Sequence, residues 1–454
     1  MSLHLPGESG RITALVRGFA LPVALAVCMA SAPAPAFGGT TDANSDRRSG
    51  VVKPVITQLR PYMASKAPDI EEFTLPKKYS IPHGIAVDSK DRIWVTEMGA
   101  NSLAVLDPAS STLKEYRIPS TVGLPESDWK YDPKKRTPPT HDAINIYSVG
   151  EPGALIVDSN DTLWFVMQLG NSVVRFDPVK EEFTEFMIPT PNSLPYDLAS
   201  DSKGLIWFVE KNEGKLGYLD VEKKKNVEIE IEPGASLMGI TIDSNDKIWI
   251  GDTAGNYIAR YDPVTKKIRK FPISVPVSQP GQMRFDKKGI LWICNLHSQQ
   301  LGVLMPGPGV YSVVDLPGWN AVPQALAITD SGDIWIVDSM TNQIGFFDQT
   351  GLAWTLFSIP TTNSQPMNMV IDSKGSIWFT QSSRNANKIA RLIPSTIVKP
   401  ESSFPTRENG GGAANKLKRE SSISDKTTLY ILGIVVLAVL FTGAFLFIRL
   451  RSKS

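Results

Sequence analysis

The chain has 454 residues, and its composition of 42% hydrophobic and 20% charged residues is ordinary for a globular protein. This composition excludes wholesale disorder and a membrane protein with many spans. Lysine and arginine number 47 against 46 aspartate and glutamate, so the net charge of +1 gives no support for nucleic-acid binding. The two cysteines, Cys28 and Cys294, are too few for a disulfide framework or a cysteine zinc site.

The N-terminal segment has the organisation of a secretory signal. Two arginines precede an apolar stretch from Phe19 to Ala30, and small residues follow before Phe37. This order is typical of a signal peptide, and the apolar stretch is too short to span a bilayer. We therefore predict a signal peptide over residues 1–36 and an N-terminal extension over residues 37–69.

The middle of the chain is one motif repeated seven times. A tryptophan marks each unit: Trp94, Trp164, Trp207, Trp249, Trp292, Trp335 and Trp378. The last five intervals are 43, 42, 43, 43 and 43 residues, and the first interval of 70 leaves room for an insertion of 27. Each unit contains four short strand patterns separated by turn sequences such as Asp-Ser-Lys-Asp. Four strands per repeat of about 43 residues predict an all-β, seven-bladed β-propeller over residues 70–394.

The ends of the repeat array predict how the ring closes. The seventh unit has only three strand patterns, and the missing fourth occurs at Ile70–Pro76. We expect this N-terminal strand to complete the last blade, which leaves no sheet edge open. The tryptophans are expected to pack between blades, and the aspartates that lie six residues before them are expected to cap turns.

The C-terminal segment predicts a membrane anchor. Residues Leu429–Ile448 contain no charge, and as a helix they would span about 30 Å, the thickness of a hydrocarbon core. We predict a flexible stalk over residues 395–426, a transmembrane helix over 427–448 and a cytoplasmic tail over 449–454. Together with the signal peptide, this predicts a single-pass protein of the cell membrane with the propeller on the extracytoplasmic side.

Two positions in each repeat are expected at one mouth of the central channel. The start of the innermost strand and the end of the antiparallel second strand lie on the same face of a propeller. The positions eleven residues before each tryptophan are His83, Gly153, Tyr196, Met238, Gly281, Gln324 and Met367. The positions three residues after it are Glu97, Met167, Glu210, Asp252, Asn295, Asp338 and Gln381.

The second set of positions is rich in oxygen ligands. Six of its seven members carry a side-chain oxygen, and oxygen ligands favour Mg²⁺ or Ca²⁺ over zinc. The sequence therefore predicts a divalent-cation site, with a hydrated polar pore as the alternative. The candidate ligands are Glu97, Glu210, Asp252, Asn295 and Asp338.

His83 and Glu97 form the one histidine–carboxylate pair that a single repeat places at these positions. A neutral histidine is a general base, and a carboxylate orients it or holds a cation. The insertion over residues 121–150 belongs to a connection on the same face and carries His141 as a second candidate histidine. Long loops in regular arrays are often functional, and a surface excursion is the alternative. We expect Cys294 to be a buried, unreactive thiol and His297 to lie in a loop.

The repeat that runs from Pro82 through Asp107 to Pro119 resembles that of virginiamycin B lyase, also called streptogramin B lyase. Related blades occur in gluconolactonase-like and NHL-type propellers. The resemblance implies a Mg²⁺-dependent elimination that opens a cyclic depsipeptide, in which a histidine abstracts the proton α to the ester carbonyl. It also implies that a glutamate fourteen residues later supports the site, and His83 and Glu97 match that pair. The lyase has a further histidine in the preceding blade, where this chain has Met367.

Two classes of function remain open from the sequence. The first is an extracytoplasmic, metal-dependent lyase with His83 as the base and Glu97 as its partner. The second is a non-catalytic propeller at the cell surface that binds a protein, a glycan or a small ligand at the same mouth. In either case we expect a monomeric propeller with a small-molecule or surface ligand, no nucleic-acid partner, and contact with the membrane through the C-terminal helix.

Overall fold

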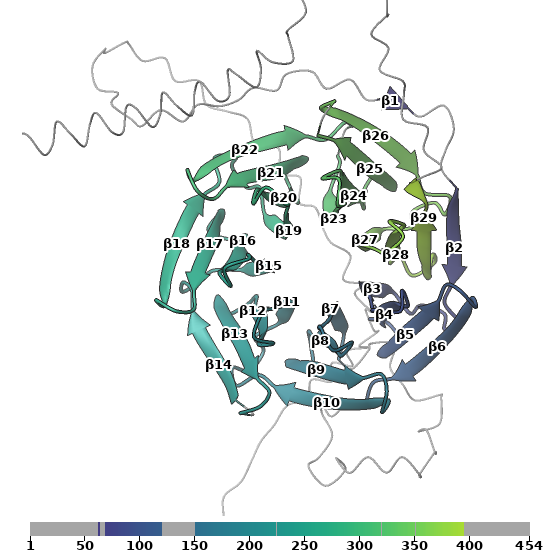
Figure 1. The fold of residues 1–454 in the computed structure, drawn as a ribbon, viewed down its shortest axis with the longest axis horizontal. Coiled ribbons are helices and arrows are strands. Elements are labelled where there is room, and N and C mark those ends of the chain that lie inside the picture. The colour runs from purple at the N-terminus through teal and green to yellow at the C-terminus, as the bar shows by residue number, and fades with distance from the viewer. Residues whose placement is uncertain are drawn as a thin grey trace, which may run out of the picture. The chain divides into compact units, whose positions relative to one another are not determined.

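The computed structural model describes residues 62–63, 69–119 and 150–394, apart from residues 224, 319 and 350. These residues form seven β-sheets arranged around a ring, with four strands in each blade (Figure 1). The prediction of an all-β, seven-bladed propeller is therefore confirmed. The predicted signal peptide, His141, the stalk and the apolar C-terminal segment lie outside the described residues. The part of the chain that the structure describes contains no helix with the length and apolar character of a membrane span.

In six blades the four strands follow one another in sequence from the centre of the ring to its rim, and in blade 7 the N-terminal strand forms the rim (Figure 1). The first, innermost strands are β3 (Pro82–Val87), β7 (Pro152–Val157), β11 (Pro195–Ser200), β15 (Leu237–Ile242), β19 (Pro280–Phe285), β23 (Pro323–Ile328) and β27 (Pro366–Ile371). The second strands are β4 (Ile93–Glu97), β8 (Leu163–Met167), β12 (Ile206–Glu210), β16 (Ile248–Asp252), β20 (Leu291–Asn295), β24 (Ile334–Asp338) and β28 (Ile377–Gln381).

The outer strands complete the blades. The third strands are β5 (Ser102–Asp107), β9 (Ser172–Asp177), β13 (Lys215–Asp220), β17 (Tyr257–Asp262), β21 (Gln300–Met305), β25 (Gln343–Asp348) and β29 (Lys388–Leu392). The fourth strands are β6 (Thr112–Arg117), β10 (Glu182–Met187), β14 (Lys225–Glu230), β18 (Lys267–Pro272), β22 (Val310–Asp315), β26 (Ala353–Ser358) and β2 (Ile70–Thr74). Each first strand packs against the first strand of the next blade, and β27 packs against β3.

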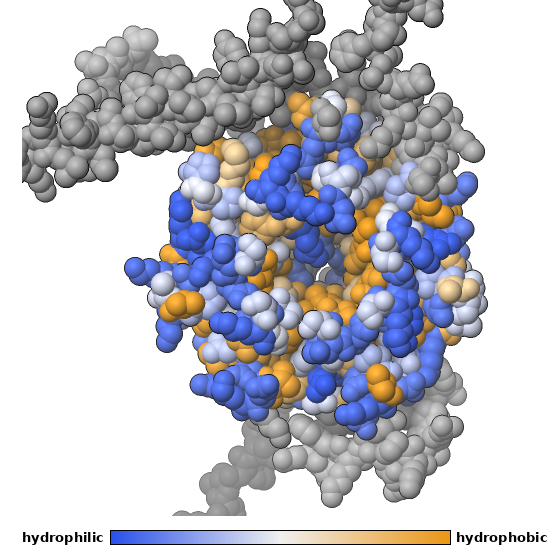
Figure 2. Space-filling view, viewed as in Figure 1, coloured by the Kyte–Doolittle hydropathy of each residue, from blue (hydrophilic) through white to orange (hydrophobic). Residues whose placement is uncertain are grey.

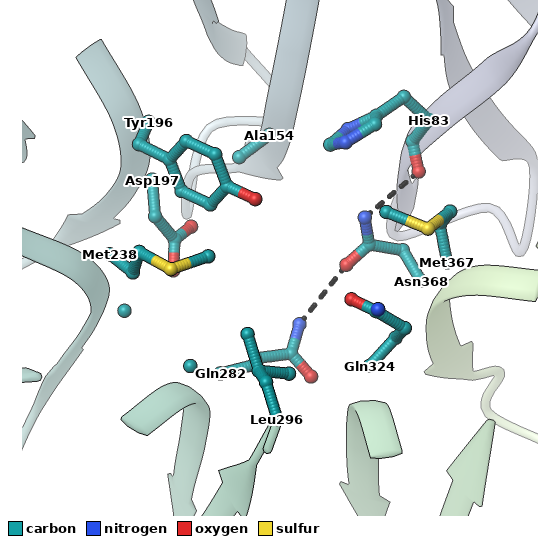
Figure 3. A pocket seen from close by; sticks show the side chains of 12 residues that line it. His83, Ala154, Tyr196, Asp197, Met238, Gln282, Leu296, Gln324, Met367 and Asn368 are labelled. Carbon is teal, nitrogen blue, oxygen red and sulfur yellow. Dashed lines mark hydrogen bonds between the residues drawn. The ribbon is translucent and has the colours of Figure 1, made fainter. Parts of the chain in front are cut away.

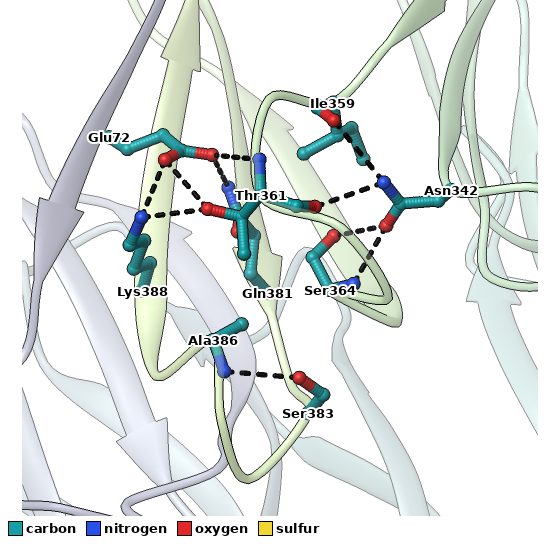
Figure 4. Close-up of polar contacts among 9 residues, drawn as sticks. All are labelled: Glu72, Asn342, Ile359, Thr361, Ser364, Gln381, Ser383, Ala386 and Lys388. Atoms are coloured by element: carbon teal, nitrogen blue, oxygen red, sulfur yellow. Dashed lines mark hydrogen bonds and ion pairs between the residues drawn. The ribbon is translucent and has the colours of Figure 1, made fainter.

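The N-terminal strand closes the ring as the sequence predicts. β2 pairs antiparallel with β29, with Ile70 opposite Leu392, so it supplies the fourth strand of blade 7. Glu72 on β2 accepts hydrogen bonds from Thr361, Gln381 and Lys388, which ties the two ends of the array together (Figure 4). The structure adds one element that the repeat pattern did not predict: β1 (Tyr62–Met63) pairs parallel with β26.

The tryptophans pack between blades, as predicted. All seven are 5% exposed or less, and Trp94 of blade 1 lies 5.7 Å from the Phe176 ring of blade 2. In six blades the indole N–H donates to the aspartate six residues earlier, for example Trp207 to Asp201 at 2.9 Å. The other oxygen of Asp201 accepts two backbone N–H groups of the turn. The same side chain therefore caps the turn and fixes the core, while blade 6 has Thr329 at that position.

Candidate functional site

The central cavity is built by β-bulges. In blade 1, Pro82 is opposite Glu97 but Ile85 is opposite Val95, so His83 and Gly84 together oppose Thr96 alone. The first strand of every blade has a register shift at the same place. A bulge leaves a side chain out of the regular alternation and re-aims it. Here the bulged residues turn toward the axis of the ring.

Eleven of the twelve residues that line the cavity are bulge residues, and the twelfth is Leu296. The cavity has a volume of about 50 Å³, which admits a small group rather than a whole large ligand. The space-filling view shows the hollow at the centre of the ring, where hydrophobic and hydrophilic surface meet (Figure 2). The lining residues are His83, Ala154, Tyr196, Asp197, Met238, Gly239, Gly281, Gln282, Leu296, Gln324, Met367 and Asn368 (Figure 3).

The structure separates the two sets of positions that the sequence placed together. Six of the seven residues predicted eleven positions before the tryptophans line the cavity, and in blade 2 Ala154 lines it in place of the predicted Gly153. The second set does not line it: all seven members are 5% exposed or less. Side chains of the second strand alternate between the two faces of the blade, and these faces pack against neighbouring blades. The expectation that both sets surround the mouth is therefore corrected for the second set.

His83 is the basic residue of the cavity. Its backbone carbonyl accepts hydrogen bonds from the Asn368 amide at 3.0 Å and the Thr380 hydroxyl at 3.3 Å, which fix the bulge against blade 7. The side chain is 8% exposed, and its Nδ1 has no hydrogen-bond partner. Burial lowers the pKa of His83 to about 4, so the imidazole is neutral at pH 7 and able to accept a proton.

Glu97 lies at the end of β4, on the side of blade 1 that packs against blade 7. It is fully buried, and neither carboxylate oxygen has a hydrogen-bond partner. Burial and then the nearby charge of Glu115 raise the pKa of Glu97, and the Lys77 ammonium opposes this shift. Lys77 reaches Glu115 at 3.5 Å and donates to Ser102 at 2.6 Å. Glu97 is therefore a buried, unsatisfied acceptor close to the cavity but not on its wall.

Glu210 repeats this arrangement in blade 3. It is fully buried with both oxygens unpartnered, and burial followed by the charge of Glu228 raises its pKa to about 7. The Lys215 ammonium binds Glu228 at 3.2 Å and partly opposes the shift. Blade 1 has Ser102 where blade 3 has Lys215, and Lys77 supplies the cation there instead.

The other three candidate ligands, Asp252, Asn295 and Asp338, already make hydrogen bonds to neighbouring protein groups. Asp252 accepts the backbone N–H groups of Ser236 and Ala254. The Asn295 amide and the Tyr311 hydroxyl share hydrogen bonds, and Asp338 accepts four, two of them from Thr341. Within the described ranges, no three His, Cys, Asp or Glu side chains come together as a metal-binding group. The structure therefore does not bring the five predicted ligands together in one cluster.

A single-carboxylate site remains compatible with the residues present. Mg²⁺ keeps several waters and is commonly held by one or two carboxylates. The two orphaned oxygens of Glu97, with Glu115 beside it, provide such a donor set. Cation binding at Glu97 stays a prediction.

The cavity also contains residues that sequence reasoning missed. Asp197, Gln282 and Asn368 each follow a predicted position, because the bulge turns two successive residues inward. Gln282 donates to Asn368 at 3.2 Å and accepts from the backbone N–H of Leu326 in the next blade (Figure 3). A bulge predicted after the proline that begins most inner strands would have found all three. Cys294 is buried and burial raises the pKa of its thiol, while His297 lies exposed between β20 and β21, both as predicted.

The described residues therefore form a seven-bladed propeller with a cavity at its axis. His83 is the one histidine among the described residues that line this cavity. The family model for the virginiamycin B lyase family matches residues 143–409, more than half of the chain. The chain therefore belongs to the virginiamycin B lyase family. The match begins after blade 1, so His83 and Glu97 lie outside the matched residues.

Solved structures share the propeller fold. A streptogramin B lyase structure is 25% identical with a TM-score of 0.63, and the alignment covers 73% of this chain and 99% of that one. A catalytically inactive variant of Staphylococcus aureus virginiamycin B lyase with quinupristin is 23% identical with a TM-score of 0.61, covering 71% and 98%. YCF48 bound to the D1 peptide shares the fold at 11% identity and a TM-score of 0.55, covering 74% and 98%. A comparison with curated protein sequences finds no match.

Proposed function

We propose that this protein is a carbon–oxygen lyase that opens an ester by elimination at the central cavity. The observation that carries the proposal is His83: a buried imidazole, neutral at pH 7, that a β-bulge aims into a small cavity. Family membership and the likeness to streptogramin B lyase support the reaction type.

The residues of the chain have distinct roles in this proposal. The imidazole of His83 takes the proton α to a carbonyl, and the hydrogen bonds to its own backbone carbonyl hold the ring at the cavity. Met238, Met367 and Leu296 give the cavity apolar walls, and an apolar environment favours the uncharged form of the imidazole, which is the form that can accept a proton. The small cavity volume means that the reacting group enters while the rest of the ligand stays on the face of the ring.

A divalent cation is part of the proposal. Glu97 would hold it. His141 stays the candidate second catalytic histidine, outside the described residues. When bound, Mg²⁺ supplies a positive charge that stabilises the negative charge of an enolate. We further propose that the signal peptide and the helix over residues 427–448 place the propeller on the extracytoplasmic side of a membrane.

Quinupristin is the first substrate to test, since a relative has been solved with it. We expect conversion that requires Mg²⁺ and falls at least about 10³-fold in His83→Ala, because the reaction then has no base. His297→Ala is the matched control, since His297 lies exposed in a loop and should leave the rate unchanged. Full turnover in His83→Ala would remove the proposed base.

A non-catalytic binding propeller is the second candidate, and exposed apolar residues favour it. Several lie in connections on the face where the inner strands begin, which is the His83 face: Tyr79, Leu169, Val277 and Met340. A contiguous apolar patch is typical of a surface that binds a partner, and this candidate requires these four side chains to form one; Val179, Val264 and Leu352 are exposed at the opposite face. This candidate predicts no turnover of any ester, with partner affinity reduced by Val277→Ser.

A further inference from the structure

Tyr196 lines the same cavity as His83, two blades further round the ring. It is a bulge residue of β11, and Figure 3 shows the Tyr196 hydroxyl and the His83 imidazole directed into the cavity on either side of Ala154. Within the described part of the chain, the Tyr196 hydroxyl makes no hydrogen bond, although its ring packs against the hydrophobic cluster of blades 3 and 4. The hydroxyl is therefore a free donor in the same cavity as the base.

The surroundings of Tyr196 keep this donor protonated and fixed. Burial and then the adjacent Asp197 carboxylate raise the pKa of Tyr196 to about 12. Asp197 itself accepts the backbone N–H groups of Leu198 and Ile240, so it is not a partner for the hydroxyl. The Lys211 ammonium lies 4.5 Å from the centroid of the Tyr196 ring, which places a cation on the ring face. The phenol is held by its ring, and its O–H remains available.

We propose that the Tyr196 hydroxyl is the hydrogen-bond donor for the carbonyl oxygen of an uncharged ester or amide ligand in this cavity. This inference rests on the proposed function and extends it to the blade 3 part of the cavity wall. The ligand class follows from the lining, because Gln282, Gln324 and Asn368 are neutral amides and Asp197 is already hydrogen-bonded. None of the lining residues that the structure describes is a lysine or an arginine, so they offer an anionic ligand no side-chain cation.

The role of Tyr196 in elimination is to stabilise a charge, and it transfers no proton. The α carbon–hydrogen bond breaks and its proton goes to His83, while the electron pair moves onto the carbonyl oxygen as an enolate. The Tyr196 O–H donates to that oxygen. This carbonyl flanks the α carbon and is not the carbonyl of the ester that leaves, whose oxygen is bonded to the β carbon. The enolate then collapses to a double bond between the α and β carbons as the bond from the β carbon to the ester oxygen breaks and the carboxylate leaves.

An acylating reagent tests the donor without a known substrate. Diethyl pyrocarbonate is an uncharged carbonyl compound whose carbonyl carbon is attacked by a neutral imidazole. The new nitrogen–carbon bond forms through an oxyanion, and the pyrocarbonate carbon–oxygen bond then breaks, releasing ethanol and carbon dioxide. Peptide mass spectrometry at pH 7 gives the rate at His83, with the exposed His297 as the internal reference.

We expect the ratio of the His83 modification rate to the His297 modification rate to fall about tenfold in Tyr196→Phe. This loss is smaller than the ~10²–10³-fold loss of rate seen when an enzyme loses an optimised oxyanion donor. Tyr218→Phe is the matched control, because Tyr218 packs against the same cluster and lies outside the cavity lining. It should keep the wild-type ratio within about twofold.

Three results would overturn the inference: an unchanged ratio in Tyr196→Phe, an equal loss in Tyr218→Phe, or no modification of wild-type His83. The proposed function fails separately. If quinupristin is not converted but the ratio falls, the elimination is wrong and the donor stands. If quinupristin is converted and the ratio does not change, only the donor is wrong.

Discussion

Glu210→Gln should stabilise the propeller at alkaline pH and leave it unchanged at acid pH. Glu210 is fully buried with no hydrogen-bond partner, and burial followed by the charge of Glu228 raises its pKa from 4.5 to about 7. Below pH 4.5 the carboxyl is protonated in both the folded and unfolded chain, so it carries no penalty. Between pH 4.5 and 7 the unfolded chain ionises it and the folded chain does not. Above pH 7 the carboxyl is ionised in both the folded and the unfolded chain. The folded state then carries the full cost of a buried charge, which the pKa shift puts at about 3 kcal/mol.

Thermal unfolding in chelated buffer measures this effect. For a propeller over residues 70–394, the unfolding entropy is about 0.7 kcal/mol/K, so the glutamine variant should unfold about 5 °C higher than wild type at pH 8. At pH 4.5 the two should unfold together. Glu228→Gln is the control with the opposite sign, because Lys215 and Thr190 bind the Glu228 carboxylate and its loss should lower stability at pH 8. A glutamine variant no more stable than wild type at pH 8, or equally stabilised at both pH values, would refute the reasoning.

Three further substitutions test the packing that holds the site. Asp201→Ala leaves the Trp207 indole N–H and two turn N–H groups without their acceptor, and should cost about 2–3 kcal/mol in denaturant unfolding; an unchanged midpoint would contradict the capping role. Glu72→Ala removes the hydrogen bonds that close the ring and should lower the unfolding temperature by several degrees, whereas an unaltered transition would show that strand pairing alone closes it. Gly217→Ala places a Cβ against the Phe208 ring and should cost about 1–3 kcal/mol, so a neutral result would mean that Phe208 moves freely.

The repeat made the fold predictable because each blade uses the same local rules. The tryptophan period fixed the number of blades, and the Asp201-type turn cap and the N-terminal strand followed from turn chemistry and edge closure. These features depend on neighbours within one repeat or between adjacent repeats. The two-residue strand β1 was not predicted, since a pairing of two residues leaves no sequence pattern.

The site was only partly predictable, because a bulge changes which side chains face the axis. Regular alternation placed Glu97 and His83 at one mouth, but the bulge at His83 sends that residue inward while Glu97 stays between blades. The equivalent bulge of β11 brings Asp197 into the cavity beside Tyr196. Composition alone does not reveal an extra residue in a strand, so the second inward residue could be found only by reading the proline that begins most inner strands as the start of a bulge.

The mass of the product formed from quinupristin tests the central claim most directly. Elimination opens the ring without adding atoms, so the linear product has the mass of the substrate and contains a new carbon–carbon double bond. Hydrolysis would add the mass of one water. We predict a linear product of unchanged mass with wild-type protein and Mg²⁺, and none with His83→Ala. A product heavier by one water, or the same product from His83→Ala, would contradict elimination by His83 at the central cavity.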